Sequence, residues 1–155
     1  MKRKKLLYLV ANDRYFCSHR LSLALAAKEQ SYDVYVVTPA LGDHEKIIKA
    51  GLSFIPIPFQ RGGINPFKEL KTIYQIWMLY KKIQPDVVHH VALKPVLYGT
   101  IAAFFARIPR IINAVAGLGH IFAADSWLKT PLKLAMRFLL SLKSVQVIVQ
   151  NPEDF

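Results

Sequence analysis

Six short apolar runs, rich in valine, isoleucine and leucine, alternate along the chain with segments of helical pattern. Most of these runs are continuous, which is typical of strands buried on both faces. The regular alternation predicts one α/β domain over residues 1–155, a doubly wound parallel sheet of about six strands with helices on both faces. The predicted strands are residues 6–11, 33–38, 52–57, 86–90, 110–115 and 145–150. The predicted helices are residues 18–30, 43–50, 66–84, 94–107 and 127–143.

The helix boundaries rest on local signals. Ser18 is a suitable N-cap for the first predicted helix. Asn65 and Pro66 supply a cap and a first-turn proline for the third, and Pro85 ends that helix before the next strand.

Composition restricts the kind of protein. Cys17 is the one cysteine, so a disulfide scaffold is excluded and a reducing compartment is favoured. The apolar run after the basic residues 2–5 is too short for a secretory signal, and we interpret it as the first strand. The 21 Lys and Arg residues outnumber the 10 Asp and Glu, giving a net charge of +11. That charge favours an anionic partner, and a mean hydropathy of +0.24 favours a membrane surface over nucleic acid.

In a doubly wound sheet, ligands bind beyond the carboxyl ends of the strands, where the strand order reverses. With the strand order 3-2-1-4-5-6 that is common in such sheets, this crevice lies between the loops after the first and fourth strands. We expect a cationic rim suited to phosphate groups there. The residues at these strand ends include Asn12, Ser18, His19, Arg20, Arg61, His90, Lys94, Gly117, Gly119 and His120. His89 and His90 are adjacent on a strand, so their side chains point to opposite faces.

Several signatures are absent from the sequence. No Walker loop, dinucleotide-binding glycine motif or Cys/His metal spacing is present. We therefore expect neither a metal nor a bound cofactor.

Two predicted helices carry basic faces suited to a bilayer interface. In the last helix, Met136 and Leu140 lie within the basic arc, and the opposite arc, which includes Leu134 and Phe138, is expected to face the core. Solvated lysine faces are the alternative interpretation. The residues expected at the membrane are Lys68, Lys71, Lys82, Lys129, Lys133 and Arg137.

The motifs resemble a known family. The segments concerned are residues 16–26, 31–39, 51–57, 61–66, 85–90 and 94–95, and most distinctively Asn113 to Gly119 followed by Ile121 and Phe122. In this order they resemble retaining glycosyltransferases of family 4 with the GT-B fold, in the branch that builds polysaccharides on lipid carriers. The resemblance covers residues 6 to 155.

The resemblance implies a Rossmann-like N-terminal half that binds the acceptor, with the nucleotide-diphosphate sugar held mainly by a C-terminal domain that this chain lacks. Ser18, His19 and Arg20 would stabilise the leaving diphosphate, while His90, Lys94 and residues 117–120 would line the sugar side. His90 would replace the family's catalytic histidine, whose position is Val91 here. The enzyme would need no metal and would lie in the cytoplasm, peripheral on the inner face of the cell membrane.

Two other functions stay open. One is a non-catalytic, membrane-docked half of a split glycosyltransferase, which recruits a separate catalytic half. The other is a generic nucleotide-binding α/β domain. In the favoured interpretation, in which the chain is the acceptor-binding half of a two-domain enzyme, the 155-residue chain alone transfers no sugar.

Overall fold

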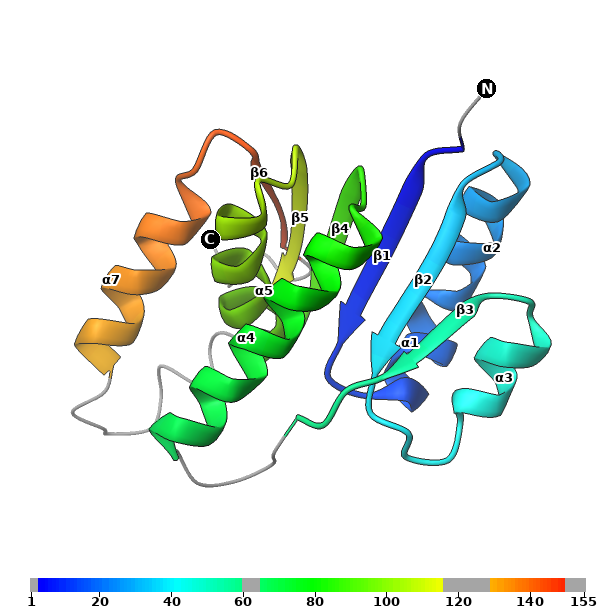
Figure 1. Ribbon diagram of the computed structural model, residues 1–155, viewed down its shortest axis with the longest axis horizontal. Coiled ribbons are helices and arrows are strands. Elements are labelled where there is room, and N and C mark those ends of the chain that lie inside the picture. The colour runs from blue at the N-terminus through cyan, green and yellow to red at the C-terminus, as the bar shows by residue number, and fades with distance from the viewer. Residues whose placement is uncertain (1–2, 60–64, 116–128, 150–155) are drawn as a thin grey trace.

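The computed structural model describes residues 3–59, 65–115 and 129–149. Its centre is one parallel sheet with the strand order β3-β2-β1-β4-β5-β6, so the predicted topology is confirmed (Figure 1). Each predicted strand forms, with ends shifted by one residue at most. The strands are β1 (Lys5–Val10), β2 (Asp33–Thr38), β3 (Ser53–Pro56), β4 (Val87–Val91), β5 (Arg110–Val115) and β6 (Val145–Val149).

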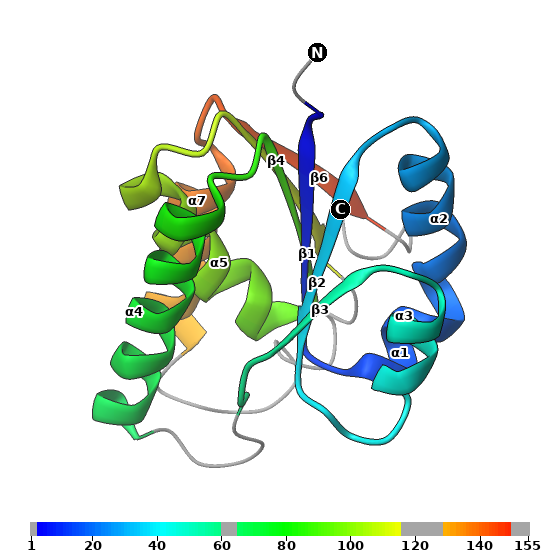
Figure 2. The ribbon, with the colours of Figure 1, turned by 45° about the vertical axis from the view of Figure 1, so that its right-hand side comes forward.

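Helices cover both faces of the sheet, as predicted. Figure 2 shows α4, α5 and α7 on one face and α1, α2 and α3 on the other. The helices are α1 (Asp13–His19), α2 (Leu21–Glu29), α3 (His44–Lys49), α4 (Pro66–Ile83), α5 (Leu93–Ala106) and α7 (Lys129–Leu140).

The central strand β1 shows why its sequence is continuously apolar. Leu7 and Leu9 pack under α4 and α5, whereas Leu6, Tyr8 and Val10 pack under the helices of the opposite face. All five are almost fully buried. Because successive residues of a strand point to opposite faces, a strand covered on both sides has no solvent-facing position to fill with a polar residue.

The first helix begins earlier than Ser18, so that prediction is wrong. Asn12 is the N-cap of α1, and its side-chain oxygen accepts hydrogen bonds from the backbone nitrogens of Arg14 at 2.9 Å and Tyr15 at 3.4 Å. The helical stretch breaks at Arg20, where α2 starts. Ser18 lies inside α1, and its hydroxyl contacts the carbonyls of the preceding turn. By contrast, Asn65 caps α4 as expected.

The exposed face of α7 also differs from the prediction. Met136 is buried and packs with Val96 and Leu140, whereas Leu134 is 62% exposed and Phe138 is 66% exposed. The apolar pattern of this helix is compatible with two orientations, and packing against α5 selects the one that buries Met136.

Candidate functional site

The carboxyl ends of β1 and β4 form the switch point of the sheet. These strands are neighbours, but α1 follows β1 on one face and α5 follows β4 on the other. Ala92 makes the turn into α5 with φ 80° and ψ 163°, a strained conformation for a residue other than glycine. Ligands of doubly wound sheets bind at such a point.

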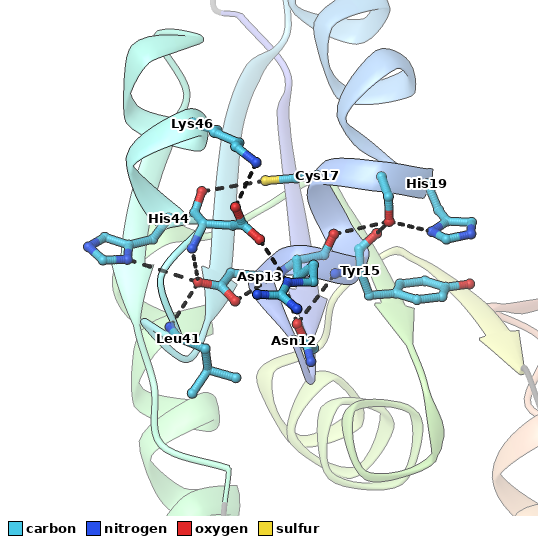
Figure 3. Close-up of polar contacts among 11 residues, drawn as sticks. Asn12, Asp13, Tyr15, Cys17, His19, Leu41, His44 and Lys46 are labelled. Atoms are coloured by element: carbon cyan, nitrogen blue, oxygen red, sulfur yellow. Dashed lines mark hydrogen bonds and ion pairs between the residues drawn. The ribbon is translucent and has the colours of Figure 1, made fainter.

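A buried carboxylate fixes the start of α1. Figure 3 shows Asp13 between α1 and the segment after β2. Its Oδ2 accepts hydrogen bonds from the backbone nitrogens of Leu41 at 2.8 Å and Asp43 at 3.0 Å. The side chain has no exposed surface. Asp13 therefore ties the loop after β2 to the loop after β1, a role that the sequence analysis missed although Asn12-Asp13 directly follows a predicted strand.

A second acidic residue, Asp43, forms ion pairs with two neighbouring cations. Asp43 lies 2.7 Å from Lys46 Nζ and 3.2 Å from Arg14 Nε (Figure 3). Hydrogen bonds from Lys46 and then Arg14 lower the pKa of Asp43. Burial and the charge of Asp43 raise the pKa of the Cys17 thiol, whose Sγ donates to the Asp43 carbonyl at 3.5 Å. Cys17 is therefore held as a thiol rather than as a reactive thiolate.

Two predicted site residues lie exposed at the end of α1. Ser18 Oγ is 2.6 Å from His19 Nδ1, and the His19 ring stacks on Tyr15 with centroids 4.3 Å apart (Figure 3). The pair presents a hydroxyl and an imidazole at the rim.

Arg20 is the cation at this rim that lacks a counter-charge in the described residues. Its Nε and Nη2 atoms are buried and make no hydrogen bond there. Burial raises the pKa of Tyr8, and the charge of Arg20 opposes that rise. Burial lowers the pKa of His89, and the charge of Arg20 lowers it further. The charge of Arg20 therefore acts on the two aromatic side chains Tyr8 and His89.

His90 belongs to a buried polar network on the other face of the sheet. The Tyr80 hydroxyl of α4 lies 2.9 Å from His90 Nε2, and Asn113 Oδ1 of β5 lies 2.7 Å from His90 Nδ1. Asn113 Nδ2 donates to Thr100 Oγ1 at 2.9 Å, which leaves its oxygen to accept from His90 Nδ1–H. Both imidazole nitrogens are therefore satisfied, with Tyr80 donating to Nε2.

This network encloses the His90 ring in the interior, so the ring does not line the crevice. The side chain has no exposed surface, and burial lowers its pKa to about 3, against the opposing effect of the Asn113 hydrogen bond. The structure therefore contradicts the expectation that the His90 ring lines the sugar side of the crevice, because the ring is fully enclosed. The prediction that His89 and His90 face opposite sides is confirmed.

Lys94 has an acidic partner that the sequence did not reveal. Its Nζ lies 2.8 Å from Glu69 Oε1 of α4. Burial opposes ionisation of Glu69, but hydrogen bonds from Lys94 and Tyr98 outweigh it and lower the pKa. The cation at the start of α5 is thus matched by a carboxylate before any ligand binds.

The remaining predicted rim residues, Arg61, Gly117, Gly119 and His120, lie outside the described residues. Within the part that the structure describes, no group of three His, Cys, Asp or Glu side chains could hold a metal ion.

The described site residues fall into two groups. The fold brings Asn12, Ser18, His19 and Arg20 to one edge of the sheet and separates them from His90.

Comparisons with known proteins agree with this architecture. The chain is similar to the N,N'-diacetylbacillosaminyl-diphospho-undecaprenol alpha-1,3-N-acetylgalactosaminyltransferase of Campylobacter jejuni, with 27% identity over 144 residues, 85% of this chain and 38% of the relative. It is also similar to a UDP-Gal:alpha-D-GlcNAc-diphosphoundecaprenol alpha-1,3-galactosyltransferase of Escherichia coli, with 24% identity over 110 residues, 71% of this chain and 27% of the relative. The chain thus spans less than half the length of either curated relative.

Solved structures show the same fold. The crystal structure of MurG from Acinetobacter baumannii matches with a TM-score of 0.67 and 18% identity, over 98% of this chain and 42% of that chain. The family model described as glycosyl transferase 4-like matches residues 5–151. Because that match takes in all six strands, the chain belongs to the glycosyl transferase 4-like family.

Proposed function

We propose that this chain is the acceptor-binding part of a glycosyltransferase that moves a sugar from a nucleotide-diphosphate sugar to a lipid-linked acceptor. The observation that carries this proposal is the family match over residues 5–151. The two curated relatives support the acceptor class, since both names specify a sugar on diphospho-undecaprenol. The donor would bind mainly to a further domain or a partner half, because the chain spans only 38% and 27% of those relatives.

The geometry of the sheet supports an anionic ligand at the switch point. Arg20 and the N-terminus of α5 lie at this edge, and both favour negative charge. In sugar transfer from a nucleotide diphosphate, the leaving diphosphate needs positive groups and helix N-termini around it. The diphosphate of a lipid-linked acceptor needs the same surroundings.

Binding of the acceptor by the 155-residue chain tests the proposal. A short-chain prenyl-diphospho-sugar, titrated into the purified chain by calorimetry, should bind, whereas the same chain should show no sugar transfer with a panel of nucleotide sugars. Absence of acceptor binding would contradict the acceptor assignment. Sustained turnover would contradict the proposal that the donor binds mainly to a further domain or a partner half.

We also propose that the protein lies peripherally on the inner face of the cell membrane, in the cytoplasm. No described helix is long and apolar enough to cross a bilayer. A stripe of large apolar side chains is nevertheless exposed along α4, at the spacing of one helical face. The stripe consists of Phe67 at 84%, Leu70 at 65%, Tyr74 at 56% and Met78 at 47% exposed.

Basic residues accompany this stripe. Lys68, Lys71 and Lys82 are exposed on the same helix, and Arg137 accompanies the exposed Leu134 and Phe138 of α7. The side chains of Lys129 and Lys133 lie outside the described part. Apolar residues flanked by lysines suit an interface with anionic lipid.

Co-sedimentation with vesicles tests the membrane surface. Each lysine near an anionic bilayer contributes about 1 kcal/mol, so Lys71→Glu should cost about 2 kcal/mol, roughly a thirtyfold loss of affinity. Lys49→Glu, on α3 of the opposite layer, is the matched control and should bind like the wild type. Equal loss from both variants, or equal binding to neutral vesicles, would refute the assignment to α4.

A further inference from the structure

Two buried polar groups on one face of the sheet have no partner among the described residues. They are the Nε and Nη2 atoms of Arg20 and the Nε2 atom of His89. His89 is 3% exposed, and its ring stacks on Tyr8 with centroids 5.1 Å apart. Almost all buried polar groups in folded proteins are hydrogen-bonded, so two guanidinium nitrogens without a partner there, whose charge acts on an imidazole that also has a nitrogen without a partner there, need an explanation.

A groove on this face of the sheet is lined by His89. Its floor is formed by neighbouring residues of four strands, since Tyr8 pairs with His89, His89 with Ile112, and Ile112 with Gln146. One wall is α2, which contributes Leu23 and Ala27, among other residues. The volume of the groove is about 540 Å³.

Arg20 is the N-cap of α2 and lies about one helical turn before Leu23, the first α2 residue that lines the groove, although Arg20 is not itself a lining residue. It precedes Leu23 by three residues and Ala27 by seven, so the three positions share one face of the helical stretch. Among the residues that the structure describes, the lining includes Arg110 at the amino-terminal end of β5 and no carboxylate. A partly buried cation without a counter-charge is costly, and an anion entering the groove would relieve that cost.

We propose that Arg20 and His89 together bind a phosphoryl group that reaches them through this groove. The guanidinium would hold two phosphoryl oxygens as a fork, and neutral His89 would donate its Nε2–H to a third. This inference rests on the proposed function, in which the phosphoryl group belongs either to the diphosphate of the lipid-linked acceptor or to the nucleotide diphosphate of the donor.

His89 suits this role and His90 does not. The two rings lie on opposite faces, and both nitrogens of His90 are engaged by Tyr80 and Asn113. In the described part of the chain, His89 Nε2 has no hydrogen-bond partner. Burial, and then the charge of Arg20, lowers the pKa of His89 to about 4, so the ring is neutral at pH 7 and Arg20 carries the positive charge.

Titration of the 155-residue chain with inorganic pyrophosphate tests the pair. Arg20→Met and His89→Phe, which keeps a ring against Tyr8, should each weaken binding at least tenfold. Arg14→Met is the matched control, because Arg14 is exposed and paired with Asp43. In nuclear magnetic resonance of the imidazole nitrogens, pyrophosphate should raise the pKa of His89 and leave that of His90 unchanged. Equal affinity of wild type, Arg20→Met and His89→Phe would overturn the inference.

Thermal unfolding separates a binding role from a structural one. Removing an unpaired cation should leave the melting temperature of Arg20→Met unchanged or raise it, whereas a structural role for Arg20 would lower it. Arg20→Lys, which keeps the charge and loses the fork, should retain part of the affinity for pyrophosphate.

Two further ligands identify the source of the phosphoryl group. Tighter binding of farnesyl diphosphate than of UDP, lost in His89→Phe, supports the acceptor, and the reverse order supports the donor. Acceptor binding that is indifferent to both substitutions would overturn this inference and leave the proposed function standing. Pyrophosphate binding that depends on Arg20, in a chain that binds no prenyl diphosphate, would support the pair and contradict the acceptor assignment.

Discussion

The two neighbouring histidines should make the fold sensitive to mild acid. Burial is the main reason that the pKa of His90 falls to about 3 and that of His89 to about 4. In the unfolded chain both groups return to about 6.5. Between these values the unfolded state binds more protons than the folded state, so the free energy of unfolding falls as the pH falls. The contribution of the neutral histidines is complete above about pH 6.5 and is lost toward pH 4 and 3.

The magnitude follows from the size of the shifts. A pH of 5 is about 1.5 units below the pKa of a histidine in the unfolded chain. Each of the two histidines therefore lowers the free energy of unfolding by about 2 kcal/mol at that pH. Both together cost about 4 kcal/mol, a large part of the roughly 5–15 kcal/mol of a typical domain. Asp43 and Glu69 do not contribute in this window, because their lowered pKa values destabilise the fold only below about pH 4.5.

Urea denaturation followed by circular dichroism, at constant ionic strength between pH 7 and pH 5, measures this effect. We expect the free energy of unfolding of the wild type to fall by about 4 kcal/mol, and that of His89→Phe by about half as much. A stability that stays constant or rises over this interval would refute the reasoning, because at least one ring would then be charged or exposed in the folded state.

Three further substitutions probe contacts described above, each by urea denaturation. A Cβ added in Gly99→Ala would lie 2.6 Å from His90, so we expect a loss of about 1–3 kcal/mol, and a neutral effect would contradict the packing. Asp13→Ala leaves two backbone N–H groups without their acceptor and should cost about 2–4 kcal/mol, whereas an unchanged midpoint would contradict the clamp. A double-mutant cycle of Lys94→Met and Glu69→Gln should give a coupling of about 1 kcal/mol, and additive effects would contradict the ion pair.

The candidate site was less predictable than the sheet. Lys94 was expected in a cationic rim suited to phosphate groups, yet Glu69, 25 residues earlier, supplies its counter-charge. His90 was expected to line the sugar side, but its ring is buried, and His89 on the opposite face of the sheet is the histidine that lines a groove. Strand periodicity shows that two adjacent residues face opposite sides, but it does not show which side the substrate approaches.

The sequence by itself determined the alternation of strands and helices and the family. Continuous apolar runs, Asn65 before Pro66 and ordered family motifs are local signals, and each reports on residues close in the chain. Tertiary structure decided which face of α7 is buried and which of the two histidine rings has both nitrogens hydrogen-bonded in the interior. It also decided that the charge of Arg20, which has no counter-charge among the described residues, acts on His89. These outcomes depend on residues that lie far apart in the chain and meet only after the helices pack on the sheet, so no local pattern contains them.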